Sequence, residues 1–177
     1  MKRISALFLV VLLTFSLVAC GNSKTEENTG VPDAFQKLSY DDFNNLAMEK
    51  GFSPVENTDN SQLEFKRSFT ISNDGDFNLT FYEVANTSMA YTYFNFVMQT
   101  YESYSSEFSS LQKYKDYGCY VMKDNNVTLY IAFVENTLMY SLMISDDSAS
   151  NKQSREELIK FVDFVDYPML DFPEFKN

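Results

Sequence analysis

The chain has 177 residues, of which 25 are acidic and 14 are basic, so its formal net charge is −11; 45% of its residues are hydrophobic and 16% are aromatic. This composition is typical of one globular domain and excludes a largely disordered chain, and the acidic balance argues against nucleic-acid binding, because phosphates require a basic surface. The chain contains no histidine, which excludes Ser-His and Cys-His catalytic pairs and the commonest zinc ligand.

The N-terminal residues have the pattern of a secretory signal peptide. Lys2 and Arg3 precede an apolar run over residues 4–18, which is shorter than the span of about 20 residues that a transmembrane helix needs. A transmembrane helix is the alternative interpretation, but the run ends in a pattern typical of a cleavage site. Small residues precede a cysteine there, in the sequence Leu17-Val18-Ala19-Cys20-Gly21.

This segment resembles the lipobox of bacterial lipoproteins. The resemblance implies a thioether-linked diacylglycerol on Cys20, cleavage before Cys20 by a lipoprotein signal peptidase, and usually a third acyl chain on the new amine. Two or more acyl chains anchor a protein stably, so the implied location is the extracytoplasmic side of the cell membrane. We therefore expect a signal peptide over 1–19, a lipidated cysteine with a flexible tether over 20–35, and a single globular domain over 36–177.

The lipid, and not charge, is expected to hold the mature chain to the membrane. Loss of Lys2 and Arg3 with the signal peptide changes the formal charge from −11 to −13, and an anionic membrane surface repels such a chain. The polar residues of 21–33 are expected to hold the domain away from the bilayer. With Cys20 lipidated, Cys119 is the only remaining thiol, which excludes an intramolecular disulfide.

The first predicted elements are a helix and a β-hairpin. Ser39 is predicted to cap a helix that Gly51 terminates, and alternating apolar residues then predict strands over 63–71 and 77–84. One face of the first strand is expected to carry Leu63, Phe65, Phe69 and Ile71. A three-residue loop ending at Gly75 is expected to pair Phe69 with Leu79 and Ile71 with Phe77.

A second helix and three strands form the expected centre of the domain. Asn86 and its neighbours offer caps for a helix whose apolar stripe runs from Met89 to Tyr101. A Ser-rich loop leads to strands predicted over 117–123, 127–134 and 137–144, joined by two-residue turns. One continuously apolar face of these strands is expected to form the core, with the pairs Phe133–Leu138, Ile131–Tyr140, Leu129–Leu142 and Val127–Ile144.

The last predicted element is a helix that begins at a capping box of Ser154 and Glu157 and breaks at Pro168. Its inward residues are expected to be Leu158, Phe161, Val162 and Val165. The pattern predicts an α+β fold with an antiparallel sheet of about five to six strands and three helices. Their order is helix, strands, helix, strands, helix, and the helices are expected to pack on one face of the sheet.

The second face of the last three strands is more apolar than a solvated face needs to be. Its residues are Cys119, Val121, Tyr130, Ala132, Met139 and Ser141. One hypothesis is that a helix or the C-terminal tail covers it, through Met169, Leu170, Phe172 and Phe175. The other is an interaction face anchored by Tyr130 and Met139, with Val121 and Ala132 beside them.

Few patterns in the chain indicate chemistry. Asp74, Asp76 and Asn78 match the start of a calcium loop, but the later ligand positions do not match, so a solvated turn is expected. Ser110 and Lys113 have the spacing of a serine-lysine pair, which we attribute to chance. Cys119 is expected to be a small buried hydrophobic side chain. We predict no catalytic residue, no metal site and no cofactor.

Three functions remain open from the sequence. The first is a lipid-anchored binding or interaction module that acts on a protein partner in the bacterial envelope. The second is a binder of small molecules or cell-wall fragments, for which the 12 tyrosines could supply stacking platforms. The third is an enzyme, which is disfavoured because no grouping of carboxylate, lysine, tyrosine or thiol side chains stands out.

Overall fold

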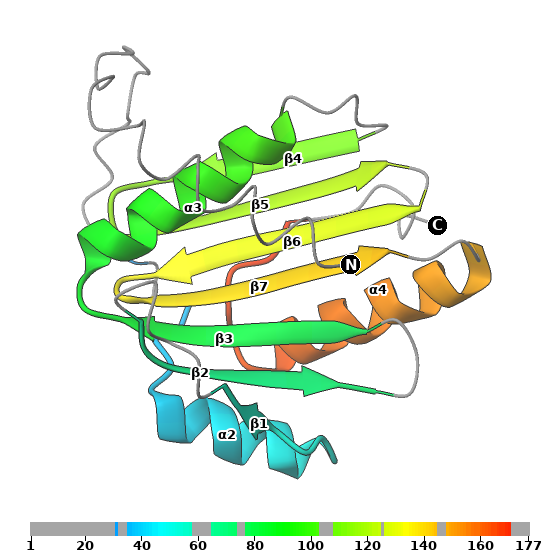
Figure 1. Cartoon of the computed structure of the whole chain (residues 1–177), viewed down its shortest axis with the longest axis horizontal. Helices are drawn as coiled ribbons and strands as arrows, with labels where there is room; N and C mark the ends of the chain where they lie inside the picture. Colours follow the sequence, from blue (N-terminus) through cyan, green and yellow to red (C-terminus); the bar gives the residue numbers. More distant parts are fainter. Residues whose placement is uncertain are drawn as a thin grey trace.

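A seven-stranded antiparallel sheet forms the framework of the molecule (Figure 1). The computed structural model describes residues 31, 35–57, 65–73, 77–102, 108–124, 126–144 and 148–170, without the side chains of 148–151. The elements in this part of the chain are α2 (Tyr40–Glu49), β1 (Val55–Glu56), β2 (Phe65–Ser72), β3 (Asn78–Val84), α3 (Thr87–Glu102), β4 (Phe108–Lys113), β5 (Tyr117–Asp124), β6 (Val127–Val134), β7 (Thr137–Ile144) and α4 (Ser148–Phe164). The α+β class is confirmed, whereas the predicted strand number is too low.

The strands lie in the order β1-β2-β3-β7-β6-β5-β4. The sequence-based prediction lacks two of them, β1 and β4, and both lie at the edges of the sheet. β1 has only two residues, and β4 lies where the Ser-rich loop is predicted. The β4 sequence Phe-Ser-Ser-Leu-Gln-Lys has little intrinsic strand preference, so its pairing with β5 makes it a strand.

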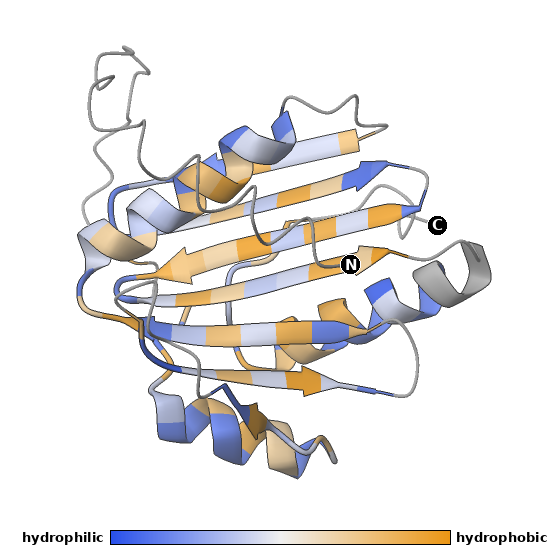
Figure 2. Cartoon of the chain, in the orientation of Figure 1, coloured by the Kyte–Doolittle hydropathy of each residue, from blue (hydrophilic) through white to orange (hydrophobic). Residues whose placement is uncertain are grey.

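Helices cover both faces of the sheet, which corrects the expectation of helices on one face. α3 packs on one face, here called the α3 face, and α2 and α4 pack on the other, here called the α4 face (Figure 1). Figure 2 shows apolar residues along β5, β6 and β7. Because these strands are apolar on both faces, each face needs a cover of its own.

Aromatic rings fill the space between the sheet and its helices. On the α4 face, the ring of Phe43 stacks on Phe81 with centroids 4.7 Å apart and meets the ring of Phe161 edge-on at 5.8 Å. On the α3 face, Phe94 lies 5.1 Å from Phe133. The rings of Phe43, Phe81, Phe94 and Phe133 are all fully buried. The layers between the sheet and its helices are therefore closed to solvent on both faces.

Several local predictions are confirmed. The Ser39 hydroxyl accepts a hydrogen bond from the Asp42 N–H at 3.1 Å and caps α2, and Gly51 follows the helix with a φ of +86°, which favours glycine. Asn86 caps α3 by accepting a hydrogen bond from the Met89 N–H at 3.0 Å. All four predicted pairs between β6 and β7 are present: Phe133–Leu138, Ile131–Tyr140, Leu129–Leu142 and Val127–Ile144.

The predicted register between β2 and β3 is wrong by two residues. Phe69 lies opposite Phe81, and Ile71 lies opposite Leu79. A shift of two residues leaves every side chain on the same face, so apolar alternation cannot distinguish the two registers. The loop over 74–76, with Asp74, Gly75 and Asp76, lies outside the described residues, as does Leu63.

Two further expectations about local structure are corrected. The register shifts between Phe65 and Arg67, and this bulge places Phe65 on the α3 face, away from Phe69. α4 begins at Ser148, so Ser154 lies inside the helix and is buried, and it does not form a capping box. The predicted inward residues of this helix are all buried: Leu158, Phe161, Val162 and Val165.

Candidate functional site

The predicted interaction face lies in the interior. Tyr130, Met139, Val121 and Ala132 are each 0% exposed on the α4 face. α4 and the segment Tyr167–Leu170 cover them, and Met169 and Leu170 pack against the same cluster. The hypothesis of an exposed face at these residues is therefore wrong, and a helix with part of the C-terminal segment covers it. Phe172 and Phe175 lie outside the described residues.

Hydrogen bonds fasten the segment Tyr167–Leu170, here called the C-terminal clasp, across the sheet. The Tyr130 hydroxyl donates to the Pro168 carbonyl at 2.9 Å, and the Val134 N–H donates to the Tyr167 hydroxyl at 3.1 Å. The Tyr167 hydroxyl also lies 3.0 Å from the Thr137 hydroxyl. Each of these groups is buried, so losing a partner would leave a polar atom without solvent, and the clasp is firmly held.

Cys119 lies beneath the clasp and is fully buried, as expected for a small hydrophobic side chain. Burial raises the pKa of the Cys119 thiol well above its ordinary value, and the hydrogen bond to the backbone of Leu170 only partly opposes this. Because the thiolate is the reactive form, this cysteine is a poor nucleophile.

The α3 face has an area that its helix does not cover. α3 lies mainly over β6, and β2 with the outer parts of β3 and β7 extends beyond it (Figure 1). We call this area the open face and define it by Thr70, Thr80, Tyr82, Tyr140, Leu142 and Ile144. Ile144 is 63% exposed and the other five are half-buried. Ile144 and Leu142 were expected in the closed core, so the structure moves the accessible surface to the opposite side of the sheet.

A row of hydrogen bonds crosses the open face. The Asn57 amide donates to the hydroxyls of Ser68 and Thr70, each at 3.1 Å. The Thr70 hydroxyl lies 3.0 Å from that of Thr80. Thr80 in turn bonds to the Tyr82 hydroxyl, and Tyr82 bonds to Tyr93 of α3. The row joins Asn57, which follows β1, to β2, β3 and the helix, and it presents hydroxyl groups along its length.

Aromatic rings border the hydroxyl row beside α3. The ring of Phe65 lies 4.6 Å from Tyr82 and 5.4 Å from Tyr93, and Tyr140 bonds to Tyr101 nearby. Burial raises the pKa of the Tyr82, Tyr93 and Tyr140 hydroxyls above the ordinary tyrosine value. These groups therefore stay neutral at physiological pH and act as hydrogen-bond donors and acceptors.

The strands of the open face carry no charge on this side. The positions that face it on β2, β3 and β7 are Ser68, Thr70, Ser72, Asn78, Thr80, Tyr82, Val84, Leu138, Tyr140, Leu142 and Ile144. The chain as a whole has a formal charge of −11, so this is a neutral area on an acidic protein. Its hydroxyl and apolar groups are suited to binding by hydrogen bonds and contact area.

The other chemical candidates are not brought together. Ser110 and Lys113 lie on β4, where a spacing of three places their side chains on opposite faces, and the Lys113 ammonium lies 3.2 Å from the Asn95 amide oxygen. Among the carboxyl groups, that of Asp42 belongs to the cap of α2, where hydrogen bonds from Ser39 lower its pKa. Over the described ranges, no group of three or more Cys, Asp or Glu side chains is placed to hold a metal ion.

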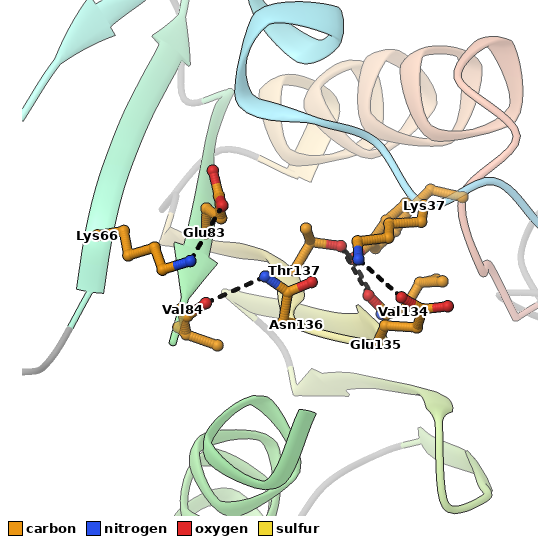
Figure 3. Close-up of polar contacts among 9 residues, drawn as sticks. Lys37, Lys66, Glu83, Val84, Val134, Glu135, Asn136 and Thr137 are labelled. Carbon is orange, nitrogen blue, oxygen red and sulfur yellow. Dashed lines mark hydrogen bonds and ion pairs between the residues drawn. The ribbon is translucent and has the colours of Figure 1, made fainter. Parts of the chain in front are cut away.

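Lys37, which precedes α2, lies beside the turn between β6 and β7 (Figure 3). The Lys37 ammonium lies 2.7 Å from the Glu135 carboxylate, and the Gln36 N–H donates to the Asp166 carbonyl at 2.9 Å. The Asn136 amide donates to the Val84 carbonyl at 3.1 Å and ties the same turn to β3. The last residues of the expected tether already pack on the domain: Val31 and Phe35 contact the core of the α4 face, and the ring of Phe35 lies 5.6 Å from that of Tyr117.

No helix in the described ranges is long and apolar enough to cross a membrane. Comparisons of the chain with protein-family models, with curated proteins and with solved structures each found no match.

Proposed function

We propose that this chain is a lipid-anchored binding module on the extracytoplasmic side of a bacterial cell membrane. Its signal peptide is residues 1–19, its diacylglycerol is on Cys20, its tether runs to residue 35, and its globular domain is 36–177. The lipobox pattern Leu17-Val18-Ala19-Cys20 supports the anchor. Because the mature chain carries a charge of −13, the lipid holds it at an anionic surface.

The observation that carries the binding role is the open face. It is an accessible sheet surface with an exposed isoleucine, half-buried tyrosines and hydroxyls, and no ionised side chain at its strand positions. Exposed apolar groups interleaved with polar ones are typical of interaction surfaces. We propose that a protein of the cell envelope binds there, and that the chain acts by binding and not by catalysis.

The second candidate function is binding of a small molecule or a cell-wall fragment. The hydroxyl row from Asn57 to Tyr93 favours it, because aligned hydroxyls with aromatic rings beside them suit a polyhydroxylated ligand.

Replacing Cys20 tests the anchor. We expect Cys20→Ala to abolish incorporation of labelled palmitate and to give either a released protein or an unprocessed precursor. The matched control is Cys119→Ala, which removes the other cysteine and is expected to stay lipidated and membrane-bound. Cell fractionation that finds mature, membrane-bound C20A would refute the anchor.

Thermal shifts and crosslinking separate the two binding roles. A ligand at a hundred times its Kd adds about 2.7 kcal/mol, which raises the midpoint by roughly 5 to 10 °C for a domain of this size. For a protein partner we expect no such shift with sugars, peptidoglycan fragments, amino acids, short peptides or divalent metals. A photo-crosslinker in place of Ile144 is then expected to capture a partner in intact cells, and one in place of Met48, which is 51% exposed on α2, is not.

A shift of several degrees with a cell-wall fragment would instead support the second function. It should disappear in Ile144→Arg, which places a charge on the open face, and persist in the control Met48→Arg. A shift that survives both substitutions would place the ligand away from the open face.

A further inference from the structure

The outer edge of β4 is a second surface, separate from the open face. β4 is the last strand of the sheet order, and in the part of the chain that the structure describes it pairs only with β5 (Figure 1). Two of its side chains, Ser109 and Leu111, are exposed, and Leu111 is 44% exposed. An edge strand of this kind presents a row of backbone donors and acceptors.

The turn between β4 and β5 fixes which backbone groups point outward. The Tyr114 N–H donates to the Tyr117 carbonyl at 2.9 Å, so these two residues form a hydrogen-bonded pair. Such pairs alternate along an antiparallel ladder, and the register runs without a shift. The N–H and C=O groups that point away from β5 are therefore those of Ser109, Leu111 and Lys113.

The β4 edge lacks the features that usually protect an edge strand from pairing with another chain. It contains no proline and no bulge, and residues 108–112 carry no charge. Lys113 is turned away over α3, with its ammonium 3.2 Å from the Asn95 amide oxygen and 5.8 Å from the centre of the Tyr91 ring. The opposite edge of the sheet, β1, is protected by its length of only two residues.

We propose that β4 binds an extended peptide segment of another protein as an added strand of the sheet. The backbone groups of Ser109, Leu111 and Lys113 supply the ladder, and the exposed Leu111 contacts an apolar side chain of the peptide. The segment is uncharged or basic, because the formal charge of the chain is −11. The same charge makes a second copy of this chain a poorer occupant, since two acidic domains repel each other.

Substitutions at Leu111 test the backbone and the side chain separately. Leu111→Pro removes an outward N–H but leaves the β4–β5 ladder intact, since proline is tolerated on an edge where its nitrogen faces solvent. The matched control Leu111→Thr keeps the N–H. The probe is a fluorescein-labelled peptide of alternating threonine and valine with lysine at both ends, and fluorescence anisotropy reports its binding to the full chain in detergent.

We expect saturable binding to the unsubstituted chain and to L111T, and at least about tenfold weaker binding to L111P. The same peptide with glutamate ends should bind about tenfold more weakly at low salt. Thermal melting checks that L111P is folded. If it is not, the peptide with its alternate backbone nitrogens methylated gives the same test on the unsubstituted chain and is expected to lose binding.

Absence of binding to the unsubstituted chain would overturn the proposal, as would equal binding to L111P and L111T. A dimer of the unsubstituted chain that L111P dissociates would assign the edge to a second copy and overturn it as well. None of these results depends on Cys20 or Ile144, so failure here is distinguishable from failure of the anchor or of the open face.

Discussion

Replacing Met139 with aspartate is expected to unfold the domain or to lower its free energy of unfolding by several kcal/mol. Met139 is 0% exposed among apolar side chains on the α4 face, beneath the C-terminal clasp and α4. A carboxylate at this position loses its hydration without gaining a partner, which is among the costliest changes in a protein core. Since domains are stable by only about 5 to 15 kcal/mol, urea unfolding should show a midpoint that is much lower or absent.

The same strand provides the control. Ile144 lies five residues further along β7, on the other face, and is 63% exposed. Ile144→Asp is expected to change the free energy of unfolding by about 0.5 kcal/mol or less, as for most exposed positions. Equal midpoints for the two variants would mean that the α4 face is not covered in solution, and would return Met139 to the list of interaction residues.

The second large effect is expected in alkaline solution, where the domain should lose stability steeply above pH 10. Burial raises the pKa of Tyr130 and Tyr167 well above the ordinary value of about 10, and burial with the hydrogen bond that the Tyr117 hydroxyl donates to Tyr114 raises the pKa of Tyr117 to about 12. Above pH 10 the unfolded chain releases these protons and the folded chain keeps them, so rising pH favours unfolding. Each such tyrosine costs about 1.4 kcal/mol per pH unit.

Urea unfolding at half-unit steps from pH 8 to pH 12 measures this dependence. The stability that the buried tyrosines contribute is fully present below pH 10 and is lost as the pH rises toward their folded pKa values. Tyr130→Phe is the matched variant, which loses the hydrogen bond to Pro168 at every pH. Above pH 10 its free energy of unfolding should fall less steeply with pH, because one fewer proton is released on unfolding. A flat profile up to pH 12 would show that these hydroxyls are not buried as described.

Local sequence patterns were sufficient for the elements whose contacts are close in the chain. The β6–β7 hairpin was predicted pair by pair because a two-residue turn fixes its register, and α2 was predicted from its cap at Ser39 and its stop at Gly51. β4 was missed because its residues prefer no particular structure and become a strand only by pairing with β5. The β2–β3 register was missed because registers two residues apart place the same side chains inward.

The candidate site was mispredicted for a different reason. Alternation identified which residues share a face, but it could not tell which face a distant element covers. Tyr130 and Met139 are covered by residues 158–170, and Ile144 is left accessible because α3 lies mainly over β6. When both faces of a strand carry many apolar residues, each face needs another layer of structure packed against it. The apolar residues on both faces of β5, β6 and β7 could therefore have predicted helices on both sides of the sheet.

The C-terminal clasp also sets the order in which the molecule can be completed during synthesis. The strands that it covers, β5 to β7, end at Ile144, while the last covering residues, Tyr167–Leu170, come more than twenty positions later. Until α4 and those residues have left the ribosome, the cover over Tyr130 and Met139 is incomplete. The α4 face therefore closes only when the last part of the chain has been made, and a product that ends before Tyr167 has an incompletely covered face, which makes it a target for proteases.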